Sequence, residues 1–155
     1  AEHLRMQIEA GADAVQIFDS NAAVLPGHLY AEASLAWIEK VLKGLPEETP
    51  TILFSKGVGH RLRDLAATGA RILSLDTTLD LPTARRSLGS HIGLQGNLDP
   101  EVLILEPEVA AREATRLLDQ MSGDPSWIVN LGHGILPQAN PDSMAALVET
   151  VTSAG

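Results

Sequence analysis

The sequence contains no cysteine among its 155 residues. It therefore has no disulfide framework, no thiolate nucleophile and no cysteine-ligated zinc. Aromatic residues make up only 3% of the chain, and 20 acidic residues outnumber 11 lysines and arginines, which leaves a net charge of −9. The few arginines are too isolated to form a basic stripe. This composition argues against a nucleic-acid surface, so we expect no nucleic-acid partner.

Long apolar runs are also missing. No stretch approaches the roughly 18 to 20 continuous apolar residues that a membrane-spanning helix needs, so we expect no membrane partner. The absence of cysteine fits a reducing compartment, and we expect a cytoplasmic location. The length suits one domain of ordinary size. Because the chain opens inside a helix-like segment without a methionine or a cap, we expect it to be part of a longer protein.

Five short apolar runs alternate with helix-like stretches. Each run is rich in leucine or β-branched residues, is too short to form a helix, and ends at Gly, Asp, Ser or Asn. These predicted strands lie at 14–18, 51–54, 71–75, 92–94 and 127–129. Apolar residues at three- and four-residue spacing predict helices at about 29–44, 59–68, 80–88, 107–121 and 141–152.

Strands that alternate with helices, with no hairpin turn between them, indicate a parallel sheet with crossover helices. A doubly wound open sheet and part of an eight-stranded barrel both fit this order. The nucleotide-binding glycine motifs of open sheets follow none of the runs, and the middle strand–helix units are close to the shortest workable length. Five units cannot close an eight-stranded barrel. We therefore predict an α/β fold of the (β/α)8 TIM-barrel type, in which residues 1–155 are the last five units of a single domain.

Polar side chains follow the apolar runs directly. In parallel α/β proteins the functional residues gather at the carboxyl ends of the strands, whereas here the opposite ends meet mostly small residues. The asymmetry predicts a binding site for a polar small molecule. The candidate residues at this rim are Asp19, Ser20, Lys56, Asp76, Asn97 and His133.

Most of these candidates also have a structural interpretation. Ser20 could cap the segment that follows it. Asp76 could form an ion pair with Lys56 across neighbouring strand ends. Asn97 and Asp99, before Pro100, are typical of a turn. These alternatives stay open on the sequence alone.

His133 is the exception, because it stands between two glycines directly after a predicted strand. Glycine on both sides removes side-chain bulk, so a ligand can approach both the imidazole and the neighbouring main chain. A core histidine rarely needs that setting, and we interpret His133 as functional. His28 and His60 lack the spacing that is typical of a metal site, and we predict none.

Taken together, the strand-end segments resemble the uroporphyrinogen decarboxylase family. The matching segments read GADAVQIFDS at 11–20, LFSKG at 53–57, LD at 75–76, LQGNLDP at 94–100 and NLGHGI at 130–135. They occur in the family's order, the last two are highly specific to it, and the resemblance runs through essentially the whole chain. It implies a distorted (β/α)8 barrel of which this chain supplies strands four to eight.

The resemblance also implies a carboxy-lyase that needs neither cofactor nor metal. The family removes CO₂ from the four acetate side chains of uroporphyrinogen, giving coproporphyrinogen in haem biosynthesis, and is typically a homodimer. By this resemblance Ser20 is a hydrogen-bond donor to a carboxylate of the tetrapyrrole substrate. His133 is a second carboxylate contact and a candidate catalytic residue.

Two departures limit the resemblance. The family's arginine pair, pyrrole-binding aspartate and tyrosine belong to its first three strands and have no counterpart in these residues, so we expect the isolated chain to be inactive. Asn21 and Thr77 stand where the family usually has bulkier residues. A non-catalytic paralogue or tetrapyrrole-binding fragment is therefore an alternative. A methyltransferase of the same superfamily is disfavoured, because those relatives hold zinc with His and Cys.

Overall fold

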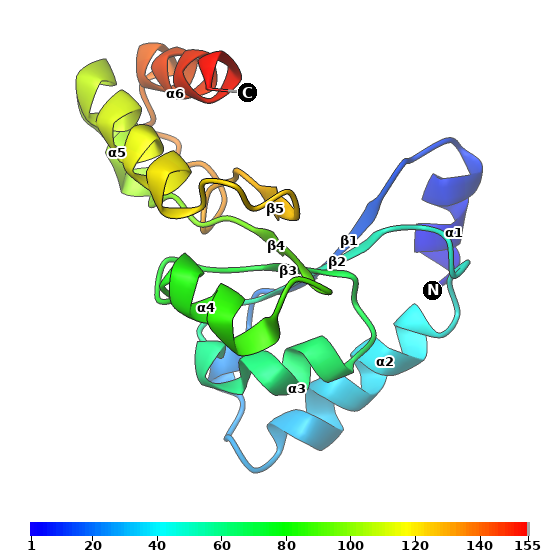
Figure 1. The fold of residues 1–155 in the computed structure, drawn as a ribbon. Helices are drawn as coiled ribbons and strands as arrows, with labels where there is room; N and C mark the ends of the chain where they lie inside the picture. Colours follow the sequence, from blue (N-terminus) through cyan, green and yellow to red (C-terminus); the bar gives the residue numbers. More distant parts are fainter. Residues whose placement is uncertain (155) are drawn as a thin grey trace.

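The computed structural model describes residues 1–154. Five strands form one sheet in which every neighbouring pair is parallel and the strand order follows the chain. The strands are β1 (Val15–Asp19), β2 (Thr51–Ser55), β3 (Ile72–Ser74), β4 (Gly93–Gln95) and β5 (Trp127–Ile128). A doubly wound sheet reverses its strand order part-way, so the sequential order excludes that alternative. The predicted partial barrel is confirmed (Figure 1).

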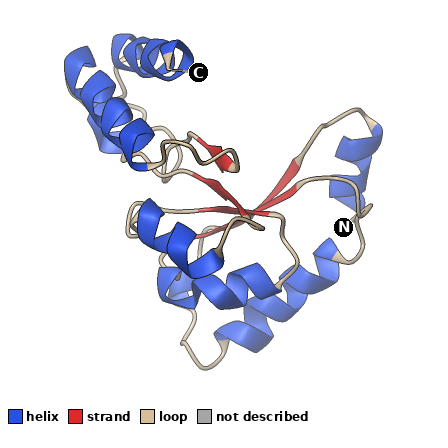
Figure 2. Cartoon of the chain, viewed as in Figure 1, coloured by secondary structure: helices blue, strands red, loops and turns tan. Residues whose placement is uncertain are grey.

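Helices join the strands and lie around the outer side of the sheet (Figure 2). They are α1 (Glu2–Glu9), α2 (Ala36–Leu42), α3 (Leu62–Ala67), α4 (Leu81–Leu88), α5 (Pro107–Gln120) and α6 (Pro141–Ser153). Short helical turns at Ala22–Val24, Ala31–Leu35, Gly59–Arg61 and Pro100–Ile104 complete the connections. None of the helices within 1–154 has the length and apolar character to cross a membrane.

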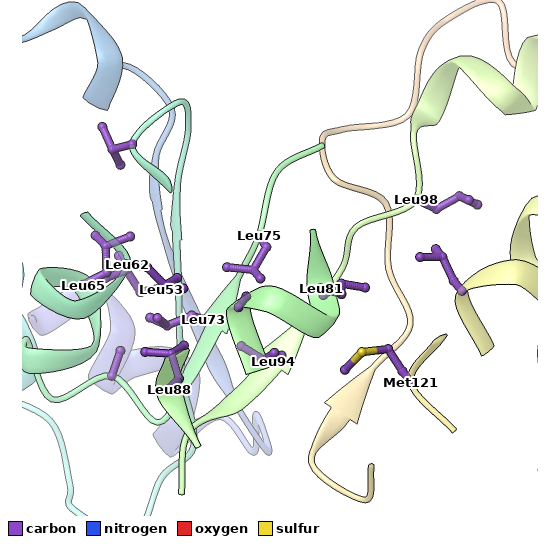
Figure 3. Packing of buried hydrophobic residues seen from close by; sticks show 14 of the residues in the cluster. Leu53, Leu62, Leu65, Leu73, Leu75, Leu81, Leu88, Leu94, Leu98 and Met121 are labelled. Carbon is purple, nitrogen blue, oxygen red and sulfur yellow. The ribbon is translucent and has the colours of Figure 1, made fainter. Parts of the chain in front are cut away.

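The apolar core lies between the sheet and the helices. Leu53, Leu73 and Leu94 occupy matched positions on neighbouring strands and are at most 1% exposed. Side chains alternate between the two faces of a strand, so these leucines all point toward the helix layer. Figure 3 shows Leu73 and Leu94 among leucines that come from the helices. The opposite, inner face is open, and Phe18 on that face is 67% exposed.

Most predicted helix ends agree with the structure, with local differences. The stretch predicted at 29–44 begins as a π-helical turn at Ala31–Leu35 before α2, and the stretch predicted at 59–68 begins as a 3₁₀ turn. β5 ends at Ile128, one residue before its predicted end, and the chain rejoins the sheet through a single bridge between Leu98 and Leu131. This parallel bridge extends the pairing beyond the end of β5 to a point two residues before His133.

Asp80 starts α4 as its N-cap, and its carboxylate accepts a hydrogen bond from the Thr83 amide at 2.9 Å. Hydrogen bonds from Thr83 hold the pKa of this carboxyl below its ordinary value. An acid with a depressed pKa stabilises the fold above its unfolded-state pKa, and the contribution is lost as the pH falls through the folded-state pKa. Replacing a capping aspartate by alanine costs about 1 kcal/mol.

We therefore expect Asp80→Ala to lower the free energy of unfolding by about 1 kcal/mol at neutral pH. The difference from the parent protein should vanish in acid below the depressed pKa of Asp80. Urea unfolding at both pH values measures this. Asp13→Ala, at an exposed aspartate outside any helix or strand, is the matched control. An equal loss of stability in both variants would contradict the capping role.

Candidate functional site

A pocket of about 380 Å³ opens on the inner face of the sheet at the carboxyl ends of the strands. Ser20 follows β1 and His133 follows β5, yet both line this pocket. The structure thus places at one pocket the two residues for which the family resemblance implies a substrate-binding role. Other side chains that line it are Gln16, Phe18, Phe54, Ser74 and Ile135.

His133 is held in place through the main chain that precedes it. The Gly132 amide donates to the Leu98 carbonyl at 2.7 Å, and Gly132 itself is buried. A Cβ on Gly132 would lie 2.7 Å from Thr77 Cγ2 and 2.8 Å from the Thr77 amide nitrogen. Only glycine allows this close approach of two backbones. Gly134, by contrast, has open space around it, so the imidazole is accessible from that side.

The imidazole of His133 has one polar and one aromatic neighbour. Lys56 Nζ lies 3.1 Å from His133 Nε2. The Phe54 ring meets the imidazole edge-on, with centroids 6.3 Å apart and an interplanar angle of 81°. Phe18 lies next to Phe54 at a centroid distance of 6.1 Å. The pocket therefore combines an apolar aromatic wall with a hydroxyl and an imidazole that can bind anions.

Asp76 does not form the expected ion pair with Lys56. Its carboxylate accepts from the Gly57 amide at 2.5 Å, and from the Thr78 amide at 2.9 Å and hydroxyl at 2.5 Å. Asp76 takes part in none of the ion pairs of residues 1–154. Three donors already occupy its carboxylate oxygens, and the Lys56 ammonium contacts His133 instead. Asp76 is only 5% exposed and ties the loop after β2 to the loop after β3.

Asp19 lies outside the pocket, although the sequence places it at the rim. Its carboxylate accepts from Ser34 Oγ at 2.5 Å and from the Tyr30 hydroxyl at 3.4 Å, so it faces the helix layer. Burial raises the pKa of Tyr30, which keeps this phenol a donor. Asp19 anchors the helical segment after β1. The next residue, Ser20, lies on the other face, as strand alternation requires.

Asn97 has a structural role, but it does not form the predicted turn. It is buried, and its Nδ2 donates to the carbonyls of Asp76 at 2.7 Å and Leu79 at 2.6 Å. It thereby fastens the loop after β3 to the segment after β4. The other predicted turn former, Asp99, does form the turn: its carboxylate accepts from the Glu101 amide at 3.0 Å. None of these contacts places Asn97 in the pocket.

Sequence reasoning missed a polar layer on the inner face of the sheet. Gln95 Nε2 donates to Ser74 Oγ at 3.0 Å and to Gln16 Oε1 at 3.3 Å. Gln16 and Ser74 also line the pocket. A signal was available at two of the three positions, because Gln16 and Ser74 each interrupt an otherwise apolar run, whereas Gln95 directly follows one.

The protein-family model described as uroporphyrinogen decarboxylase matches residues 1–154. The chain belongs to this family. It is 43% identical to the uroporphyrinogen decarboxylase of Azoarcus sp. over 155 residues, and 44% identical to that of Aromatoleum aromaticum over 154 residues. These alignments cover 97% and 96% of this chain but only 43% of each relative. The chain therefore spans less than half the length of the curated relatives it matches.

A solved structure of a methyltransferase from Methanosarcina mazei has the same arrangement of strands and helices. The TM-score is 0.79, and the match covers 94% of this chain and 43% of the methyltransferase. The two sequences are 24% identical, so this likeness concerns the fold alone. It supports the partial barrel and says nothing of the reaction.

Proposed function

We propose that the protein of which this chain forms part is a carboxy-lyase of haem biosynthesis. It removes the carboxyl groups of the four acetate side chains of uroporphyrinogen as CO₂, giving coproporphyrinogen, and needs no cofactor. The observation that carries the proposal is the shared pocket of Ser20 and His133 in a chain of this family. Residues 1–155 form the carboxyl-terminal part of its single barrel domain. The family resemblance supports a cytoplasmic homodimer.

The reaction needs an electron sink and three proton transfers. Protonation of a pyrrole ring carbon makes the ring cationic, and the carboxylate then leaves as CO₂, so that the electrons of the broken bond neutralise the ring. The methylene carbon takes up a proton, and the ring carbon finally gives up its added proton. The site must bind carboxylates and stabilise the cation that develops. The Ser20 hydroxyl and the His133 imidazole supply polar contacts for substrate carboxylates, and His133 is the candidate for proton transfer. The exposed Phe18 and the neighbouring Phe54 offer an apolar surface for a pyrrole ring.

The assay for this proposal is the conversion of uroporphyrinogen to coproporphyrinogen by the full-length protein. We expect turnover by the full-length protein and none by the isolated 155 residues. An octacarboxylate is repelled by a chain of net charge −9 that lacks the family's arginine pair. Coproporphyrinogen formation by the isolated chain would contradict the second expectation. A full-length protein that releases no CO₂ would contradict the first.

One observation favours a second candidate, a paralogue that binds tetrapyrroles without decarboxylating them. Asn21 and Thr77 stand where the family usually has bulkier residues. Asn21 directly follows Ser20, and Thr77 lies against Gly132. Such a protein would bind uroporphyrinogen in a titration but would release no CO₂. A binding titration run beside the assay therefore separates the two candidates.

A further inference from the structure

Lys56 and His133 follow strands that are not neighbours in the sheet, β2 and β5, but their side chains meet. Lys56 follows β2, and His133 lies 77 residues further along the chain. The Lys56 Nζ to His133 Nε2 distance of 3.1 Å is that of a hydrogen bond. A lysine ammonium has three donors and no acceptor. The nitrogen that faces it must therefore offer a lone pair, which leaves the proton of a neutral imidazole on Nδ1.

The contact is more than a chance meeting of two exposed side chains, because both backbones are fixed. The Lys56 amide donates to the Asp19 carbonyl at 3.1 Å, and the next amide, that of Gly57, donates to the Asp76 carboxylate at 2.5 Å. On the other side, Gly132 fixes the chain before His133 through its bond to Leu98. An exposed polar pair is usually weak because its side chains must be ordered. Fixed backbones at both ends reduce that cost.

Because His133 lines the pocket, its tautomer determines which ring nitrogen can donate to a bound ligand. His133 lines the pocket with Ser20 and also a second hollow of about 400 Å³, which Lys56, Asp76 and Thr77 line too. The imidazole thus stands between the substrate pocket and a polar hollow that Lys56 shares. With Nε2 engaged by Lys56, the Nδ1–H group is the ring's donor for a carboxylate.

We propose that Lys56 is a positioning residue that holds neutral His133 in the Nδ1–H tautomer, so that this N–H can donate to a substrate carboxylate. The carboxylate role rests on the proposed function, whereas the tautomer is a property of the protein without substrate. Asp76 and Asn97 are the supports of this arrangement. Asn97 holds the loop that carries Asp76, and Asp76 holds the amide that follows Lys56.

The tautomer is measured by ¹H–¹⁵N correlation spectra of the histidine rings of the full-length protein, in weakly alkaline buffer where neutral imidazole predominates. The signals of His133 are assigned by their loss in His133→Asn. We expect the parent protein to carry the ring proton on Nδ1. Lys56→Met should move it to Nε2, and Lys56→Arg, which keeps a cationic donor, should retain it on Nδ1. Lys43→Met, at a lysine 76% exposed on α2's carboxyl end, should leave the tautomer unchanged.

Kinetics provide the second readout. We expect Lys56→Met to lower kcat/KM for uroporphyrinogen about tenfold, mainly through KM, and Lys56→Arg to recover most of it. A parent protein with its proton on Nε2, or an unchanged tautomer in Lys56→Met, would overturn the proposal. An absence of turnover in the parent protein would reject the proposed function but leave the tautomer measurement valid, so the two failures are distinguishable.

Discussion

Replacement of His133 by asparagine is expected to lower kcat/KM for uroporphyrinogen decarboxylation by about 100-fold in the full-length protein. Asparagine keeps an amide donor and fits between the two glycines, but it cannot exchange a proton at the reacting carbon. If His133 serves both as a carboxylate contact and in proton transfer, the loss should appear mainly in kcat, since the retained amide still binds the substrate. Steady-state release of CO₂, measured over a range of substrate concentrations, separates kcat from KM.

Two comparisons make this expectation specific. Ser20→Ala removes one hydroxyl from the same pocket and should raise KM about tenfold, because a single hydrogen bond to a charged group is lost. His91→Asn, the same substitution at an exposed histidine before β4, should leave both constants unchanged. If His133→Asn stays within twofold of the parent, the imidazole does no chemistry. The paralogue that only binds tetrapyrroles becomes the better interpretation if the parent protein binds uroporphyrinogen but releases no CO₂.

The order and direction of the strands could be predicted because they depend on local pattern. Apolar runs too short for helices, separated by helical periodicity and by no hairpin turn, leave parallel strands as the solution. Caps are equally local. Asn140 before Pro141 accepts from the Asp142 amide at 3.0 Å, as a capping residue before a first-turn proline should. The π-helical turn before α2 was not predicted; Ser34 in that turn donates to Asp19, a partner 15 residues earlier that no local pattern indicates.

The candidate site shows where local pattern stops being sufficient. Asp19 and Ser20 are adjacent, yet the first faces the helices and the second faces the pocket. Which of the two residues points to which face depends only on the phase of the side-chain alternation. The few residues at a strand end are not enough to determine that phase from the sequence. Asp76 and Asn97 lie where polar functional groups are expected, but their partners come from other loops. His133 was predictable because the glycines beside it are a local signal of accessibility.

The two glycines beside His133 should respond very differently to the same substitution. Gly132→Ala is expected to lower the free energy of unfolding by about 1–3 kcal/mol, as overpacking of a buried position does. Its Cβ would lie 2.7 Å from Thr77 Cγ2 and 2.8 Å from the Thr77 amide nitrogen. A Cβ on Gly134 would have no atom within 4 Å. We therefore expect Gly134→Ala to change the free energy of unfolding by less than about 0.5 kcal/mol. Urea unfolding of both variants of the full-length protein measures the difference.

The cause of the loss can be tested through Thr77. Truncation by Thr77→Ala removes the Cγ2 atom from the contact but leaves the amide nitrogen in place. In the Gly132→Ala background it should therefore restore only part of the lost stability. Full recovery of the stability would mean that the backbone of the loop after β3 can move away from the new Cβ. Equal losses of stability in Gly132→Ala and Gly134→Ala would mean that the close approach to Thr77 is not the cause. Because Gly132 also fixes the main chain before His133, a displaced loop should lower decarboxylation as well.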